Sequence, residues 1–422
     1  MTPEHSGNKH RPPCIRRSFI YKSSKEGYRV YMQCGLCKNE SVEFLNLGSQ
    51  PLANKYPTKE QFEKEDFFPL VTYFCTRCKN VQLGTIVSRE RMFEDYYYLS
   101  SVNQGLVRHF TALAAVLAGK KFVVDIGSND GILLKPLKSL GVRAVGVEPS
   151  INVSKIANDA GLETITSFFD AATATAIKKK YGPADAVVMS SVFTHLEDPH
   201  QCLEDVKTLM EDGGDFIVEV EYIGHILDTT QFERFYLDRI FYYSLTSLKN
   251  LFEMHGMYIA DVEKVEMHGT SLRVTARKGS GTASPGVGAL LKEEEKTLTL
   301  PRLMEFKTQV DSYLGAFRDK LLEYQSQGLR VGGYGAPARV ATICNYGKIG
   351  PELIPFIVDD SPLKQIRFSP GTHIPIVPKA HLETAKPEVL VVFAFEYLDD
   401  IKKKTAGYGY RYLIPIPPRE IA

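Results

Sequence analysis

Short apolar runs alternate with helix-length segments through the middle of the chain. Four such runs, at residues 122–126, 144–147, 186–189 and 215–220, have the length and composition of buried strands. Strands that alternate with helices are typical of a doubly wound parallel sheet with helices on both faces. The pattern therefore predicts an α/β domain of Rossmann-like architecture.

The same alternation returns in the last third of the chain. Residues 329–335 are expected to form a strand that enters a glycine turn, and residues 356–359 and 389–393 further buried strands. A stretch of small and turn-forming residues, 278–286, precedes a charged helical segment over about 291–327. We therefore expect a domain junction near residue 280 and a second Rossmann-like α/β domain beyond it.

The N-terminal part lacks this alternation and holds short, turn-rich segments around two Cys-x-x-Cys pairs. A chain of 422 residues exceeds what one hydrophobic core usually organises. We therefore expect three domains: a small metal-organised domain at 1–100, a central α/β domain at 101–280 and a C-terminal α/β domain at 281–422.

Composition narrows the class of protein. Hydrophobic residues make up 44% and charged residues 24%, and no apolar run approaches the length of a transmembrane helix. The 51 Lys and Arg nearly balance the 50 Asp and Glu, so nothing indicates the basic surface of a nucleic-acid-binding protein. The first twenty residues contain no secretory apolar region. We expect a soluble, cytoplasmic protein with no nucleic-acid or membrane partner.

Four of the seven cysteines form two pairs, Cys34 with Cys37 and Cys75 with Cys78. Thiolates at this spacing converge on one ion, and four of them complete a closed tetrahedral zinc site without an open position for water. In a chain without a secretory signal, such pairs indicate metal binding rather than disulfides. The long gap between the pairs requires an inserted subdomain. We therefore predict a structural Zn²⁺; two unrelated reduced pairs are the less favoured alternative.

A glycine loop, Asp-Ile-Gly-Ser-Asn-Asp-Gly, follows the first predicted strand of the central domain. Glycine lets the chain turn tightly, so that backbone groups can approach a ligand. Glu148, which ends the next strand, is placed to bond both ribose hydroxyls of a nucleoside. An NAD site is the alternative, but an acidic loop without the GxGxxG pattern suits the cationic S-adenosylmethionine better. The predicted cofactor-binding residues are Asp125, Gly127, Ser128, Asn129, Gly131, Glu148, Pro149 and Ser190.

Candidate catalytic residues lie in three places. His195 follows the strand at 186–189, at the sheet edge where ligands bind, and could take a proton; a helix-start histidine bonded to backbone would look the same. Tyr98 lies in a cluster of phenols that could orient a substrate or pack in the core. Asp238 and Arg239 lie among aromatic residues, which indicates a cavity or a buried ion pair.

Residues 268–273 combine small residues, a hydroxyl group and a guanidinium group in one turn and strand. This combination can bind phosphate, although the end of a plain hairpin would look similar. The candidate substrate-binding residues here are His268, Ser271 and Arg273.

Together these motifs resemble the nucleotide-sugar C-methyltransferase family, which methylates carbon 3 of nucleotide-linked 4-keto deoxysugars in antibiotic and surface-polysaccharide pathways. The resemblance covers most of the chain, and its separate motifs follow in the family's order. Beyond the cysteine pairs, the glycine loop and the His195 segment, it rests on residues 47–54, 95–101, 146–149, 243–248, 268–273, 333–339, 345–346, 358–359 and 370–375.

The resemblance implies a bound zinc, S-adenosylmethionine in the middle domain and a sugar nucleotide between domains. In the implied reaction, a base removes a proton beside a ketone, and the enolate attacks the sulfonium methyl group. By position, His195, Tyr98 and Tyr236 match active-site residues of the family. Tyr334, Arg339 and Asn345 lie in motifs of its C-terminal domain and are further candidates for substrate binding.

One segment departs from the family pattern. Where the family shows Tyr-x-Glu-His, this chain has Tyr236, Leu237, Asp238 and Arg239. Arginine stays protonated in proteins, so Arg239 cannot act as a base. We expect Asp238 or His195 to take the proton and Arg239 to bind substrate.

The motifs predict an S-adenosylmethionine-dependent methyltransferase, and the resemblance implies that its substrate is a nucleotide-linked deoxysugar; we expect a monomer or homodimer. One alternative is methylation of an oxygen or nitrogen atom of a sugar nucleotide or another small metabolite. Another is a zinc-stabilised binding protein that has lost activity. A nucleic-acid methyltransferase is less consistent with a net charge of +1.

Overall fold

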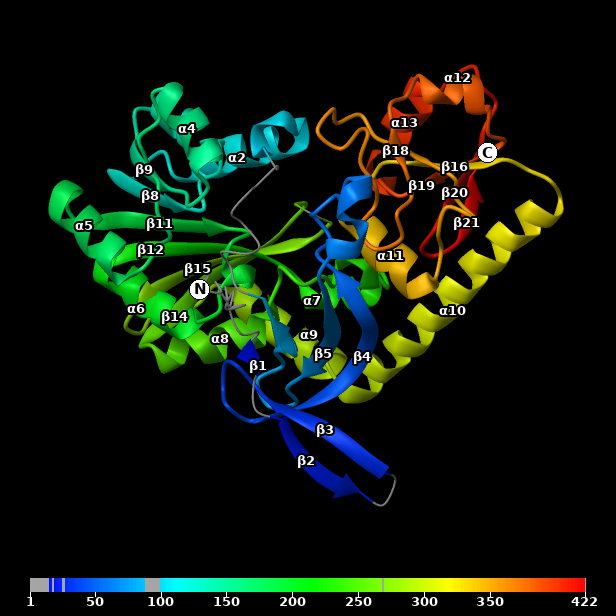
Figure 1. Cartoon of the computed structure of the whole chain (residues 1–422). Coiled ribbons are helices and arrows are strands. Elements are labelled where there is room, and N and C mark those ends of the chain that lie inside the picture. Colours follow the sequence, from blue (N-terminus) through cyan, green and yellow to red (C-terminus); the bar gives the residue numbers. More distant parts are fainter. Residues whose placement is uncertain (1–14, 17–18, 25–26, 88–98, 268, 422) are drawn as a thin grey trace, which may run out of the picture.

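A computed structural model describes residues 15–16, 19–24, 27–87, 99–267 and 269–421 (Figure 1). Two residues that were predicted to belong to the site, Tyr98 and His268, lie outside the described residues. In Figure 1 the N-terminal strands, in blue, lie below a central sheet in cyan and green and a C-terminal sheet in orange and red.

The N-terminal part is an antiparallel sheet with the strand order β13-β6-β5-β4-β3-β2. Its edge strand β13 (Phe241–Tyr242) comes from the central part of the chain, so two distant segments build one sheet. The remaining strands are β2 (Phe19–Ser24), β3 (Gly27–Gln33), β4 (Glu40–Pro51), β5 (Phe67–Phe74) and β6 (Val81–Leu83), and a separate pair joins β1 (Ile15–Arg16) to β7 (Thr85–Ile86).

The central part is a seven-stranded sheet with the order β10-β9-β8-β11-β12-β15-β14. The first five strands are parallel, and the last two are antiparallel to their neighbours. Helices lie on both faces, which confirms the predicted doubly wound architecture (Figure 1). The strands are β8 (Phe122–Ile126), β9 (Arg143–Val147), β10 (Thr164–Ile165), β11 (Ala184–Ser190), β12 (Met210–Glu221), β14 (Met257–Val265) and β15 (Ser271–Lys278). The helices are α2 (Gln104–Val116), α3 (Leu134–Ser139), α4 (Ile151–Asp159), α5 (Ala171–Tyr181), α6 (Pro199–Leu209), α7 (Ile223–Asp228) and α8 (Leu245–Met254).

The C-terminal part repeats this arrangement. Its sheet has the order β18-β17-β16-β19-β20-β21, in which the first five strands are parallel. Numbered along each domain, the parallel strands of both sheets follow the order 3-2-1-4-5, which confirms a second Rossmann-like domain. Its elements are β16 (Val331–Tyr334), α11 (Arg339–Gly347), β17 (Ile357–Val358), β18 (Ile376–Val377), α12 (His381–Ala385), β19 (Val389–Val392), α13 (Leu398–Lys404), β20 (Arg411–Ile414) and β21 (Arg419–Ile421).

The charged segment between the two α/β sheets forms two helices, α9 (Pro285–Thr297) and α10 (Leu300–Ser326), where one helical stretch over 291–327 was expected. The break falls before Pro301, since proline lacks an amide donor and is tolerated in the first turn of a helix. The long helix α10 runs along the outer side of the C-terminal sheet (Figure 1). Its buried face shares one hydrophobic core with β4 and β16.

Packing joins the three parts. One apolar cluster contains β4, α10 and the C-terminal sheet, and another contains the paired cysteines together with β11 and β12. None of the helices in the described part of the chain combines the length and apolar character needed to cross a bilayer.

Candidate functional site

The four predicted zinc ligands lie together at the boundary between the N-terminal and central sheets. Cys34 Sγ lies 3.6 Å from Cys78 Sγ, Cys37 Sγ lies 3.5 Å from Cys75 Sγ, and all four sulfur atoms lie within 4.8 Å of one another. Four converging sulfur atoms match the ligand set of a closed structural zinc site. Strands β4 and β5 fill the gap between the pairs, as the predicted insertion requires.

The two knuckles have matching backbone geometry. The Cys34 N–H donates to Asn39 O at 2.6 Å, and the Cys75 N–H donates to Asn80 O at 2.8 Å. The side-chain amides of the same asparagines approach the sulfur atoms, with Asn39 Nδ2 at 3.3 Å from Cys37 Sγ and Asn80 Nδ2 at 3.6 Å from Cys34 Sγ. Donors of this kind stabilise thiolates, which are the form that binds metal.

The predicted cofactor loop leaves β8 through two glycines that no other residue could replace without strain. Gly127 and Gly131 have φ angles of +74° and +84°. A Cβ atom on Gly127 would lie 2.2 Å from Val192 Cγ2, and one on Gly131 would lie 2.4 Å from Leu162 Cδ1. The backbone of the loop therefore packs directly against the side chains of Val192 and Leu162, and its amide groups line the carboxyl edge of the sheet.

Glu148 holds this loop from the neighbouring strand. Its carboxylate accepts the backbone N–H of Asn129 at 3.0 Å and that of Ser150 at 2.9 Å, with Pro149 half-buried between them. Each carboxylate oxygen has a second lone pair, so Glu148 can still accept ribose hydroxyls.

The loop also offers buried polar atoms that have no partner. Ser128 Oγ and Asp130 Oδ1 are buried without a hydrogen bond in the described residues. Asn129 Oδ1 accepts the N–H of Ser100, and Asp130 Oδ2 accepts the N–H and hydroxyl of Ser101, which ties the short turn before α2 to the loop. Unpaired buried polar atoms cost free energy unless a ligand satisfies them. The loop therefore fits a nucleoside cofactor.

Asp125 makes the site acidic. Burial raises the pKa of its carboxyl group to about 7, and the nearby carboxylates of Glu148 and Glu219 add to the increase. A cationic ligand beside Asp125 would oppose this shift, which is consistent with the sulfonium and amine groups of S-adenosylmethionine.

Ser190 and Arg273, from the predicted cofactor and substrate sets, meet on one buried carboxylate. Ser190 Oγ donates to Glu219 Oε2 at 2.5 Å, and Arg273 Nε donates to Glu219 Oε1 at 2.7 Å. His109 lies 2.9 Å from the same carboxylate, and Arg273 also pairs with Glu263 at 3.0 Å. Arg273 thus braces β15 against β12, while the Ser271 hydroxyl donates to Met267 O.

His195 and Asp238 lie side by side at the carboxyl end of β11. The His195 Nδ1 atom hydrogen-bonds the backbone carbonyl of Asp238, so Nδ1 carries the proton and Nε2 is the nitrogen that can accept one. Burial lowers the pKa of His195, which favours the neutral imidazole. Burial also raises the pKa of Asp238, although His195 and Arg239 oppose the increase. Asp238 Oδ1 is buried and has no hydrogen-bond partner in the described residues.

Arg239 does not pair with its neighbour Asp238. Its Nη1 atom donates to Glu221 Oε2 at 2.6 Å, and its guanidinium lies 4.5 Å from the ring centre of Tyr236. Burial disfavours the charged guanidinium, but Glu221 more than compensates and the pKa of Arg239 rises. Arg239 therefore forms a buried ion pair, but its partner is Glu221 on β12 and not the carboxylate of its own segment, Asp238.

The three C-terminal candidates lie in different places. Tyr334 OH donates to Asp360 Oδ1 at 3.1 Å, and Asn345 Nδ2 donates to the backbone carbonyls of Ala341 and Pro370. Arg339 lies at the junction with the central part, where its Nη2 atom contacts Glu396.

Four carboxylates of this region, three of them buried, were not among the predicted site residues. Two of them interrupt the apolar strand β12, and an acid inside such a run is a signal that the sequence does contain. Glu233 is fully buried, its oxygens have no hydrogen bond, and its nearest cation is Arg339 at 3.8 Å. The four residues are Glu219, Glu221, Glu233 and Glu396.

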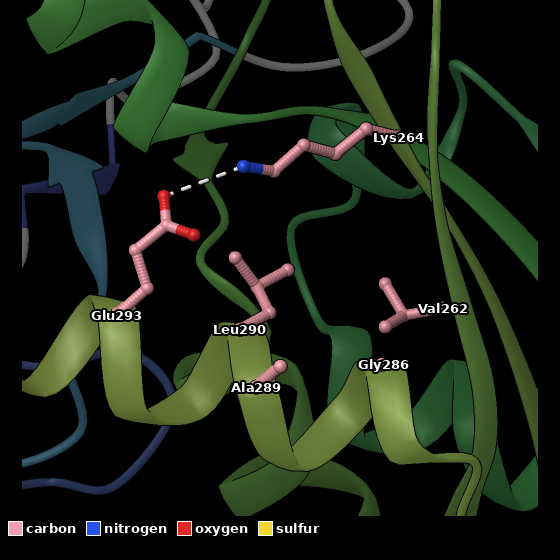
Figure 2. A pocket seen from close by; sticks show the side chains of 6 residues that line it. All are labelled: Val262, Lys264, Gly286, Ala289, Leu290 and Glu293. Atoms are coloured by element: carbon pink, nitrogen blue, oxygen red, sulfur yellow. Dashed lines mark hydrogen bonds and ion pairs between the residues drawn. The ribbon is translucent and has the colours of Figure 1, made fainter.

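A separate surface hollow lies between β14 and α9, and Figure 2 shows the residues that line it. Val262 and Lys264 line one side, and the helix contributes Gly286, Ala289, Leu290 and Glu293. Lys264 Nζ and Glu293 Oε1 form an ion pair at 3.3 Å across it. None of these residues belongs to the loop, the zinc centre or the His195 segment.

Comparisons with known proteins agree with this arrangement. Family models of a zinc binding domain, a methyltransferase domain and a C-methyltransferase C-terminal domain match residues 34–93, 88–262 and 266–417. The chain is 30% identical over 406 residues to the C-methyltransferase NovU of Streptomyces niveus, which covers 92% of this chain and 97% of that protein.

Two further similarities are confined to part of the chain. A ubiquinone biosynthesis O-methyltransferase of Cupriavidus pinatubonensis is 31% identical over 106 residues, 25% of this chain and 42% of that protein. The solved structure of magnesium protoporphyrin IX methyltransferase from Synechocystis with bound SAH is 16% identical, with a TM-score of 0.34 over 45% of this chain and 92% of that one. Because the match to the Streptomyces protein spans nearly both chains, and the cysteine cluster and glycine loop are in place, the chain belongs to the C-methyltransferase family and is an S-adenosylmethionine-dependent methyltransferase with a structural zinc centre.

Proposed function

We propose that the protein methylates a carbon atom of a nucleotide-linked deoxysugar, next to a keto group of that sugar. The observation that supports this proposal is the pairing of His195 with Asp238, whose Oδ1 atom is buried and unpaired. Transfer of a methyl group to oxygen or nitrogen requires mainly positioning, whereas transfer to carbon also requires a base that removes a C–H proton. Two potential bases in contact favour the carbon reaction.

In the proposed reaction, Asp238 Oδ1 takes the proton from the carbon beside the ketone. The electron pair of the C–H bond forms an enolate, whose carbon then bonds to the methyl group as the methyl–sulfur bond breaks. Bound S-adenosylmethionine supplies this electrophilic methyl group, and the loop at Gly127 and Glu148 would hold it. Burial raises the pKa of Asp238, which makes the carboxylate a stronger base. His195 holds the backbone of Asp238 in place and remains the alternative base.

We place the nucleotide between the central and C-terminal parts, near Arg339, on the basis of the family resemblance. We propose that the three domains span residues 1–100, 101–280 and 281–422. A cytoplasmic location is consistent with six described cysteines that form no disulfide among the described residues.

The test is an incubation of the purified protein with labelled S-adenosylmethionine and a panel of 4-keto and 4-hydroxy sugar nucleotides in deuterated water. We expect methyl transfer to a 4-keto sugar, with deuterium exchange at the carbon beside the ketone. Transfer only to hydroxyl groups would contradict the proposal and support O-methylation. Binding of the cofactor without any transfer would support a binding protein.

Variants assign the base. Asp238→Asn should abolish both exchange and transfer, because an amide cannot take the proton. His195→Ala should slow both steps, because the backbone of Asp238 loses its partner. If both variants keep full turnover, the assignment is wrong.

A further inference from the structure

One side chain of the N-terminal part reaches the carboxylate of Asp238. Asn54, which follows β4, places its Nδ2 atom 3.4 Å from Asp238 Oδ2. Among the described residues, this amide is the one side-chain donor that contacts the Asp238 carboxylate, since Oδ1 has no partner. The contact joins residues 184 positions apart in the chain.

The backbone on both sides of Asn54 is held firmly. Leu52 and Ala53 are buried, and the N–H of Lys55 donates to Leu52 O at 3.0 Å. The next residue, Tyr56, donates from its hydroxyl group to Ala336 O at 2.7 Å, at the glycine turn of the C-terminal sheet. Asn54 is itself exposed, but it stands in a short turn whose two ends are anchored in different parts of the molecule.

The loop between β17 and β18 of the C-terminal part holds this turn at a second point. Phe368 N–H donates to Pro57 O at 3.0 Å, and Arg367 Nη1 donates to Tyr56 O at 3.0 Å. Asp238 of the central part thus contacts Asn54 of the N-terminal part, and the C-terminal part holds the residues that directly follow Asn54.

We infer that Asn54 is a positioning residue for the proposed base, and that it fixes the Asp238 carboxylate so that Oδ1 faces the substrate. This inference rests on the proposed function of Asp238. An amide donor stabilises the ionised carboxylate and removes rotational freedom, whereas Oδ1 keeps both lone pairs for the proton. The N-terminal part, beyond its zinc centre, thereby contributes directly to the geometry of the reaction.

Other charged groups around Asp238 also influence its pKa. His195 contacts the Asp238 backbone from the end of β11, and Arg239 adjoins it and pairs with Glu221 of β12. The phenol of Tyr236 lies under the guanidinium of Arg239. These groups stay unchanged when Asn54 is substituted, so a change in the titration of Asp238 reports the Asn54 contact.

The first experiment needs no substrate. The full-length zinc-loaded protein is labelled with ¹³C-aspartate, Asp238→Asn identifies the Asp238 carboxyl signal, and that signal is titrated in the wild type, Asn54→Ala and Asn54→Asp. We expect the midpoint to rise by about half a pH unit in Asn54→Ala and further in Asn54→Asp, because a carboxylate loses a donor and then gains a like charge. Lys55→Ala, an exposed neighbour, should leave the midpoint unchanged. Equal midpoints in all variants would overturn the inference.

The second experiment measures kcat/KM against pH for methyl transfer. The acidic limb of the profile should move to higher pH in Asn54→Ala and further in Asn54→Asp. On the acidic side of the limb, kcat/KM of Asn54→Ala should be about three-fold lower than that of the wild type, while its zinc content stays normal. If Asp238→Asn leaves the limb in place, the proposed base is wrong, and the inference falls with it. If Asp238→Asn abolishes methyl transfer but neither Asn54 variant moves the limb, the base stands and the inference about Asn54 alone is wrong.

Discussion

Glu148 fixes the glycine loop from the neighbouring strand, since its Oε2 atom accepts the backbone N–H of Asn129 at 3.0 Å. In the C-terminal domain, Asp359 accepts the N–H of Ala336 at 2.7 Å at the same place in the sheet order. An acid after the second strand therefore braces the turn after the first strand in both domains. In the central domain this brace adjoins the cofactor loop.

Substitution of Glu148 should weaken the cofactor site. Glu148→Ala removes the acceptor for Asn129 and the proposed acceptor for ribose. We expect the affinity for S-adenosylmethionine to fall by about 10- to 100-fold, or about 1.4–2.8 kcal/mol, as measured by titration calorimetry. Asp159→Ala, at the exposed end of α4, is the control and should bind normally. Unchanged affinity of Glu148→Ala would contradict the assignment of this loop.

A methyl group at Gly127 should disrupt the loop. Gly127 and Gly141 both have φ near +74°, but a Cβ on Gly127 meets Val192 whereas one on Gly141 meets nothing within 4 Å. Gly141→Ala should therefore cost about 1 kcal/mol of stability, from backbone conformation alone. Gly127→Ala should cost more and abolish cofactor binding, as checked by chemical denaturation and calorimetry. Similar behaviour of the two variants would show that the contact with Val192 is unimportant.

Burial of Asp125 should make the cofactor-free protein less stable at higher pH. The folded group has a pKa of about 7 and the unfolded group about 3.9, so the folded state binds the extra proton between these values. Its contribution to the free energy of unfolding therefore falls as pH rises from about 4 to about 7, and stays low above that. Asp125→Asn should remove this slope and stabilise the protein at pH 8 by about 4 kcal/mol at most, as measured by denaturant unfolding. An unchanged difference between pH 5 and pH 8 would refute the prediction.

Cofactor binding should release a proton near neutral pH. A cationic ligand favours the ionised form of Asp125, so the affinity for S-adenosylmethionine should increase as pH rises from 6 to 8. Calorimetry in buffers of different ionisation enthalpy measures the proton released. In Asp125→Asn the release should disappear; if it persists, another group carries the proton.

Loss of one cysteine ligand should release the metal and destabilise the chain. Cys75→Ser leaves three thiolates, and we expect zinc content to fall well below that of the wild type, with a loss of several kcal/mol of stability. Elemental analysis and thermal unfolding measure these effects. Cys202→Ala, which removes a buried thiol outside the cluster, is the control and should retain its zinc.

Much of the fold could be predicted because its signals are local. Apolar runs predicted the positions of β8, β11 and β16 to within a few residues. The residues of the glycine loop and of each Cys-x-x-Cys pair lie in short, contiguous stretches, so the sequence alone identifies them. The prediction from sequence missed the break between α9 and α10. Helical periodicity continues through Leu298 and Thr299, whereas Pro301 interrupts the hydrogen bonding.

By itself, then, the sequence determined the two α/β domains, the cysteine ligands and the loop that ends in Gly131. Tertiary structure alone decided which side chains meet: Arg239 pairs with Glu221 instead of Asp238, Ser190 and Arg273 share Glu219, and Asn54 reaches Asp238. The physical reason is that hydrophobic periodicity records which face of an element is buried, but not which neighbour it is buried against. Partner choice depends on how sheets and domains dock, and residues far apart along the chain set that geometry together.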